Sequence, residues 1–116
     1  MKLKEYKGKE LLQSVGIAIP QGEVFTNAHV NRFGVVKAQV VGGKRGKAGL
    51  ITMTESIDSA KQAIMVILDQ KYNKMPITEV LIEDTLSGEE LYLSIVYDSV
   101  TRGPVLAFLK TGGVDV

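Results

Sequence analysis

The chain has 116 residues, with 14 basic and 13 acidic side chains, a formal net charge of +1 and no cysteine. This length suits about one small domain, and the balanced charge gives no general argument for a nucleic acid or a membrane surface as partner. The lack of cysteine excludes disulfides, a thiolate nucleophile and a thiolate metal site. The longest apolar run, residues 63–68, is far too short to span a bilayer, so we expect a soluble protein.

The N-terminal part of the chain predicts one amphipathic helix followed by an irregular segment. Apolar residues recur at helical spacing over residues 4–15, and Gly16 and Pro20 follow as typical stop signals. Residues 23–34 carry too few repeating apolar positions to predict a helix or a strand. We therefore expect the next regular element to begin at Val35.

A strand–loop–strand unit follows, and its loop is strongly basic. Strands are expected over residues 35–41 and 50–53, with a loop over residues 42–49. The stretch VVKAQVVGGKRGKAG, residues 35–49, contains four cations and no acid. Lys37 lies inside the first strand, where an ammonium group is costly to bury unless an anion pairs with it. The pattern is typical of a phosphate site, because glycines let backbone N–H groups approach an anion closely.

The second half of the chain predicts one helix and then antiparallel strands. Ser56 is expected to cap a helix that continues to about Lys71. Three strands are expected, over residues 79–83, 91–97 and 105–109, joined by polar turns into a β meander. We predict an α+β fold in which the two helices pack on one face of a small, mainly antiparallel sheet.

Three interpretations of the basic loop stay open on these residues alone. A Walker A loop is excluded, because it would need a glycine at Val41 and a Ser or Thr at Ala48, and no G-x-G-x-x-G dinucleotide motif is present. Residues 43–46 match the G-x-x-G clamp of KH RNA-binding domains, although that clamp joins two helices. The loop therefore binds the phosphates of a nucleotide, binds RNA or another anion, or is a solvated turn.

From end to end, the sequence resembles one known family. The segments MKLKEYKGKELLQSVGIAIPQG, VVKAQVVGGKRGKAG, VLIEDTLSGEELYLSIVYD and TGGVDV are similar to parts of the β subunit of ADP-forming succinyl-CoA synthetase. Malate–CoA ligase, citryl-CoA synthetase and ATP-citrate lyase share these segments. The resemblance implies the N-terminal, lid-like part of an ATP-grasp fold that acts in an ADP-forming acid–CoA ligase.

The resemblance also assigns six residues to the nucleotide. Four match the family's phosphate-contacting positions, namely Lys37, Lys44, Arg45 and Gly46. Two match acids on the adenine and ribose side, namely the hinge residue Glu83 and Glu90. Lys44 departs from the family, whose triplet here is glycine-arginine-glycine. The resemblance assigns no catalytic residue and no metal ligand to this chain.

For the intact enzyme, the resemblance implies that ATP or GTP, with Mg²⁺, phosphorylates a histidine of a partner α subunit, and that the phosphate passes to a carboxylic acid before CoA attacks. His29 does not inherit that role and is expected at the surface. The family's metal ligands lie beyond Val116. Residues 1–116 are therefore expected to be a single domain, truncated before the metal-binding half and inactive on its own.

The remaining expectations concern the partners of the chain, its location in the cell and one shortened segment. The expected partners are the α subunit and the remainder of the β subunit, with no nucleic acid and no membrane. The resemblance implies a role in the tricarboxylic acid cycle and a cytoplasmic location, or the mitochondrial matrix in a eukaryote. Residues 23–34 are shorter than the family's corresponding segment, which is expected to expose part of the sheet.

Overall fold

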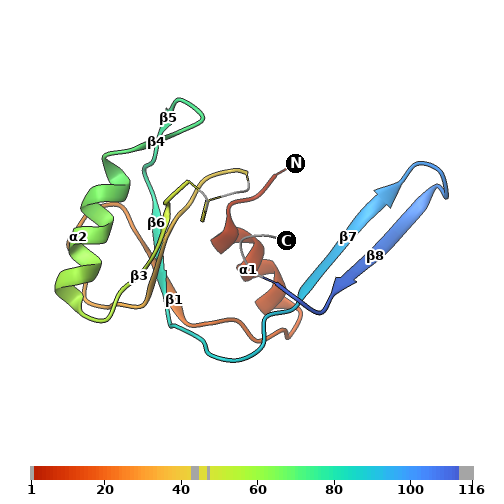
Figure 1. Ribbon diagram of the computed structural model, residues 1–116, viewed down its shortest axis with the longest axis horizontal. Helices are drawn as coiled ribbons and strands as arrows, with labels where there is room; N and C mark the ends of the chain where they lie inside the picture. The colour runs from red at the N-terminus through yellow and green to blue at the C-terminus, as the bar shows by residue number, and fades with distance from the viewer. Residues whose placement is uncertain (1, 43–44, 47, 113–116) are drawn as a thin grey trace. The chain divides into compact units, whose positions relative to one another are not determined.

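A computed structural model describes residues 2–42, 45–46 and 48–112 (Figure 1). The chain forms two compact units, Met1–Leu86 and Ser87–Val116. The first unit contains two helices, a four-stranded sheet and a short hairpin, and the second contains a longer hairpin. The predicted α+β class, with two helices and mainly antiparallel strands, is confirmed.

An antiparallel sheet organises the first unit. Its strands, in spatial order, are β1 (Gly22–Phe25), β6 (Val80–Glu83), β2 (Val35–Ala38) and β3 (Ile51–Met53). The predicted basic hairpin is confirmed, because β2 pairs with β3 and Val35 lies opposite Met53. Strand β6 lies between β1 and β2, and all four of its residues are buried.

Two predictions about the strands are wrong. The segment predicted to be irregular contains the end of β1, whose short apolar part, Val24 and Phe25, is too brief for periodicity to detect. The predicted meander over residues 79–109 does not form, because β6 pairs with β1 and β2. A strand with consecutive apolar residues, such as Val80, Leu81 and Ile82, is stable only where both its faces are covered. This requirement takes β6 to the centre of the sheet and away from the hairpin that follows it in sequence.

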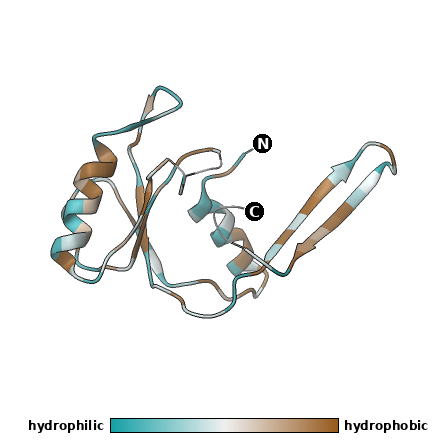
Figure 2. Cartoon of the chain, viewed as in Figure 1, coloured by the Kyte–Doolittle hydropathy of each residue, from teal (hydrophilic) through white to brown (hydrophobic). Residues whose placement is uncertain are grey.

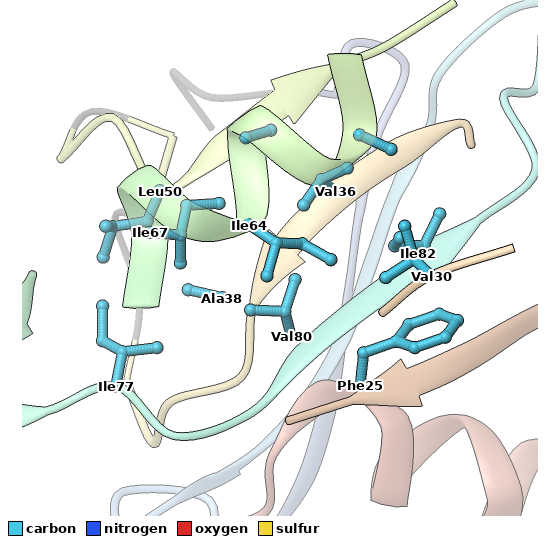
Figure 3. Packing of buried hydrophobic residues seen from close by; sticks show 12 residues of the cluster. Phe25, Val30, Val36, Ala38, Leu50, Ile64, Ile67, Ile77, Val80 and Ile82 are labelled. Carbon is cyan, nitrogen blue, oxygen red and sulfur yellow. The ribbon is translucent and has the colours of Figure 1, made fainter. Parts of the chain in front are cut away.

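Helix α2 (Ile57–Leu68) covers one face of the sheet with apolar side chains. Ser56 caps it as predicted: its hydroxyl accepts from the Ser59 N–H at 3.1 Å, and the Ser59 hydroxyl accepts from the Ser56 N–H at 3.1 Å. The core, shown in Figure 3, joins its inner residues to those of β2 and β6, namely Ala60, Ala63, Ile64, Ile67, Val36, Ala38, Val80 and Ile82.

Helix α1 (Glu5–Ser14) lies on the opposite face of the sheet. Side chains alternate along a strand, so the odd-numbered residues of β2 and β6 point away from α2. The contacts of α1 go to this side: Lys9 Nζ donates to Glu83 Oε1 at 2.6 Å, and the Tyr6 N–H donates at 2.9 Å to Oε1 of Gln39, the residue that directly follows β2. The helix has no buried residue. The prediction that both helices pack on one face is therefore wrong. The physical reason is that polar contacts, rather than apolar burial, hold α1 on its side of the sheet.

The end of α1 agrees with the prediction. Gly16 adopts φ +88°, and its N–H donates to the Gln13 carbonyl at 3.0 Å, while the Ile17 N–H donates to the Leu12 carbonyl at 3.0 Å. This pair of bonds is the Schellman motif, which favours glycine because a Cβ is strained at positive φ.

Two hairpins complete the fold. Strands β4 (Lys71–Tyr72) and β5 (Met75–Pro76), which the sequence analysis did not predict, are joined by two residues with φ values of 50° and 67°, typical of a tight type I′ turn. In the second unit, β7 (Tyr92–Asp98) pairs with β8 (Gly103–Leu109) over their full length, which confirms the strands predicted at 91–97 and 105–109.

Candidate functional site

Five charged side chains meet on the face of the sheet that α1 covers. We call this set the charge cluster, and its members are Glu5 and Lys9 on α1, Lys37 on β2, Arg45 in the loop after β2, and Glu83 on β6. Its three cations and two carboxylates leave a formal charge of +1. A partly enclosed cluster with excess positive charge is a suitable place for an anion.

Lys37 stands at the centre of the charge cluster. Its ammonium group donates to the Glu83 carboxylate and to Glu5 Oε1, the latter at 3.0 Å, and its side chain is 18% exposed. These carboxylates supply the anionic partner that the sequence predicts for a lysine inside a strand. Burial by itself lowers the pKa of Lys37, but the hydrogen bonds and charges of Glu83 and Glu5 outweigh it and raise that pKa. The ammonium group is therefore charged at neutral pH.

Glu83 is the most buried member of the charge cluster, with its side chain 4% exposed. Two glycines allow the chain to close around it. A Cβ on Gly22 would lie 2.8 Å from the Glu83 Cβ, and a Cβ on Gly34, where φ is +148°, would lie 2.2 Å from the Glu83 carbonyl oxygen. A side chain at either position would force this part of the chain to shift.

Arg45 points back from the loop toward the sheet. Its Nη1 donates to the Ala38 carbonyl at 2.9 Å, and its Nη2 donates to Glu5 Oε2 at 2.7 Å. Its own carbonyl accepts from the Leu50 N–H at 2.9 Å. The guanidinium group therefore ties the loop to the end of β2 and to α1. The neighbouring Gly46 closes the turn, since its carbonyl accepts from the Gly49 N–H at 3.2 Å.

Glu5 carries a strongly perturbed acidity. Burial by itself raises the pKa of its carboxyl group, but the hydrogen bond from Arg45 and the charges of Arg45, Lys37 and Lys9 outweigh it and lower that pKa from 4.5 to about 2. Glu5 is therefore ionised throughout the physiological range, with both of its oxygen atoms engaged by cations.

We expect Glu5 to make stability depend on pH in acid. The folded chain keeps its carboxylate charged down to about pH 2, whereas the unfolded chain binds a proton near pH 4.5, a difference worth at most about 3 kcal/mol. This stabilisation is fully present above pH 4.5 and is lost as the pH falls through 2. Urea unfolding of the wild type and of Glu5→Gln should give a difference in unfolding free energy that decreases between about pH 6 and about pH 2.5. A constant difference would refute the assignment.

A cleft of about 290 Å³ opens beside the charge cluster. Its walls come from α1, the segment that follows it and the paired strands β1 and β6, and they include Tyr6, Lys9, Ile19, Pro20, Val24, Leu81 and Glu83. The volume is close to the lower end of the range for small-molecule sites. The cleft thus joins an apolar wall to the buried carboxylate.

The structure brings together three of the six residues assigned from the sequence, namely Lys37, Arg45 and Glu83, with Gly46 next to Arg45 in the chain. Glu90 lies in the second unit, before β7, and is exposed. Lys44 lies outside the described residues. The roles of all six residues toward a nucleotide stay predictions.

Sequence reasoning missed Glu5 and Lys9. They are one helical turn apart, with Lys9 Nζ 3.4 Å from Glu5 Oε1, and such i,i+4 pairs lie on the same face of a helix. That spacing was the only available signal, and it is common on solvated helices. Nothing local to residues 5–9 indicates that they reach Lys37, Arg45 and Glu83.

Three further observations bear on the chemistry. His29 is exposed, as the sequence predicts. Among residues 2–42, 45–46 and 48–112, no three His, Asp or Glu side chains come together as a metal site. Across the same ranges, α1 and α2 both lack the length and apolar character needed to cross a bilayer.

Comparison with known proteins identifies a family for the chain. A family model described as an ATP-grasp domain matches residues 2–116. The chain is 34% identical over 125 aligned positions to the succinate–CoA ligase [ADP-forming] subunit β of Gemmatimonas aurantiaca, and 39% identical over 125 positions to that of Rubrobacter xylanophilus. It is 33% identical over 125 positions to the succinate–CoA ligase [GDP-forming] subunit β of Thermus thermophilus.

Each of these alignments covers 100% of this chain and 33% of the relative, so the chain spans about a third of the length of the curated relatives it matches. The resemblance drawn from the sequence is confirmed by these matches. Since the family model covers residues 2–116, the chain belongs to the ATP-grasp domain family and is similar throughout to the β subunits of succinate–CoA ligases.

Proposed function

We propose that this chain is the nucleotide-binding segment of an ADP-forming acid–CoA ligase of the succinate–CoA ligase type. The observation that carries the proposal is the charge cluster, in which Lys37, Arg45 and Glu83 meet beside a glycine-rich loop with one positive charge in excess. The family resemblance independently assigns these three residues to the nucleotide. The family match over residues 2–116 supports treating both units as one ATP-grasp segment.

The phosphates of ATP belong at Lys37 and the loop. An ammonium group has three N–H donors, and the two carboxylates engage two of them, so one donor is left for a phosphate oxygen. The backbone at Gly46 and the ammonium of Lys44 supply further donors, by analogy with glycine-rich phosphate loops. A phosphate here neutralises the excess positive charge of the cluster.

The base and ribose belong on the Glu83 side. The carboxylate of Glu83 has about four acceptor positions; Lys9 donates to both of its oxygens and Lys37 to Oε1, so about one position remains for the amino group of adenine. The adjoining cleft offers Pro20 and Leu81 as apolar surface for a planar ring. Glu90 is proposed to accept from a ribose hydroxyl or the base.

In the intact enzyme, we propose that the phosphoryl group bound here passes to a histidine of a partner α subunit, then to a carboxylic acid, and that CoA finally displaces it to form a thioester. When bound, Mg²⁺ neutralises phosphate charge during such transfers. The charge cluster does not fit a magnesium site, because three cations already engage Glu5 and Glu83 and Mg²⁺ needs free oxygen ligands. The task of these residues is to bind and orient the phosphates, and the isolated chain is proposed to be without ligase turnover.

Strands β7 and β8 are proposed to contact the remainder of a β subunit. Hydrophobic residues recur along both strands (Figure 2). The facing pairs Leu93–Phe108 and Ile95–Leu106 are mostly exposed, as is Val96 on the other face. A lone two-stranded hairpin is at best marginally stable in water. We propose the α subunit as a second partner, in a cytoplasmic or mitochondrial-matrix enzyme of the tricarboxylic acid cycle.

Calorimetric titration of the purified protein with ATP, GTP and a single-stranded RNA oligomer tests this function. We expect saturable ATP or GTP binding that RNA does not displace at physiological salt. RNA that displaces ATP would favour the RNA-binding interpretation of residues 43–46. Absence of binding by all three ligands would favour a purely structural segment.

A further inference from the structure

Glu5 has no role in any chemistry described so far, yet it makes the most connections within the charge cluster. Its Oε1 accepts from Lys37 Nζ at 3.0 Å and lies 3.4 Å from Lys9 Nζ, and its Oε2 accepts from Arg45 Nη2 at 2.7 Å. One carboxylate on α1 therefore joins a strand residue to a loop residue. Its side chain is 19% exposed, so these contacts are only partly screened by water.

The contact with Arg45 matters because the loop it fixes is rich in glycine. Glycine loses more backbone freedom on ordering than any other residue, so a loop of this kind is costly to hold in one conformation. Arg45 is attached at three points: its guanidinium group to Ala38 and to Glu5, and its carbonyl to the Leu50 N–H. Of these three attachments, the one to Glu5 pairs two opposite charges.

We propose that Glu5 is a positioning residue of the nucleotide site, which acts through Arg45 and holds its guanidinium group so that the loop backbone is in place before a triphosphate binds. The inference rests on the proposed function for its ligand. In this arrangement the Arg45 side chain anchors the loop, and the backbone at Arg45 and Gly46, rather than the guanidinium group, binds the phosphates. Ordering that is complete before binding does not weaken affinity.

Two other roles for Glu5 predict different results. If Glu5 only competes with phosphate for the cations, its neutralisation tightens ATP binding. If the Arg45 guanidinium itself binds phosphate, the losses caused by changing Glu5 and Arg45 add, because the two residues then act separately. If Glu5 acts through Arg45, changing both costs little more than changing one.

The test is a double-mutant cycle in the full-length protein, read by calorimetric titration with ATP. Glu5→Gln and Arg45→Met are each expected to weaken ATP binding about tenfold, and the double variant to be within about twofold of the weaker single variant. Glu5→Asp, which keeps the charge, should recover part of the affinity. Glu55→Gln is the matched control, since Glu55 is exposed and outside the charge cluster, and it should bind ATP like the wild type. Unchanged or tighter binding by Glu5→Gln, or additive losses, would overturn the proposal.

Amide hydrogen exchange provides a readout that needs no nucleotide. In Glu5→Gln, the N–H groups of Gly49 and Leu50, which close the loop on Gly46 and Arg45, should exchange about tenfold faster, while those of α2 keep their rates. If the wild type fails to bind ATP but these loop amides respond, the proposed function fails and the anchoring role stands. Unchanged exchange at both amides would overturn the anchoring role itself.

Discussion

Glu83→Gln is expected to destabilise the first unit by about 3 kcal/mol, because it removes the charge that faces two lysines in a nearly dry position. The Glu83 side chain is 4% exposed and accepts from both Lys9 and Lys37. Without its charge, three cations share the single carboxylate of Glu5, and the formal charge of the cluster rises from +1 to +2. Removing one partner of a buried ion pair is costly chiefly because the other partner stays charged.

Urea unfolding at pH 7 measures this effect. Glu55→Gln, an exposed substitution of the same kind, serves as control and should change stability by less than about 0.5 kcal/mol. Adding Lys37→Met to Glu83→Gln should recover part of the loss, because the unpaired ammonium group is then absent. A loss for Glu83→Gln no larger than that of the control would mean that the charge cluster is not a coupled unit.

Local sequence signals placed the end of α1, the start of α2 and the basic hairpin correctly, whereas the predicted end of α2 at about Lys71 is wrong, because α2 ends at Leu68 and Lys71 lies in β4. Gly16 ends α1 through its positive φ, and Ser56 begins α2 through its capping hydroxyl. Each signal acts within one helical turn, which makes it readable without knowledge of the fold. The hairpin of β2 and β3 was predictable for the same reason, since its strands are separated by a single glycine-rich loop.

The neighbours of β6 in the sheet and the side of the sheet on which α1 lies were not predictable from local signals. The pattern of β6 indicates a buried strand but not its neighbours, and its two partners are remote in sequence. The side of the sheet taken by α1 depends on polar contacts of Tyr6 and Lys9 with residues 39 and 83. A helical pattern specifies which face of α1 is apolar, and here that face is not the one that contacts the sheet.

In the candidate site too, some residues could be predicted from the sequence and others could not. Lys37 was recognisable because a lysine inside a strand demands an anionic partner, and the family resemblance added Arg45 and Glu83. Glu5 contributes two of the contacts that hold this site, yet it lies 32 residues from Lys37 and 40 from Arg45 in sequence. Only the fold brings these residues together, so no local motif could have found Glu5.

Lys37→Met tests most directly whether Lys37 binds the phosphates of a nucleotide. A hydrogen bond between charged groups contributes about 1.5–3 kcal/mol, so the loss of this ammonium should weaken ATP binding about 10- to 100-fold. Adenosine lacks phosphates and should lose little affinity. The matched control is Lys4→Met, because Lys4 pairs with Glu79 near α1 but lies outside the charge cluster.

Calorimetric titration of the wild type and the two variants with ATP and with adenosine is therefore the decisive measurement. We predict that Lys37→Met selectively loses affinity for ATP, while Lys4→Met binds both ligands like the wild type. Equal ATP affinity for the wild type and Lys37→Met, with both proteins folded, would contradict the assignment of this charge cluster to nucleotide phosphate.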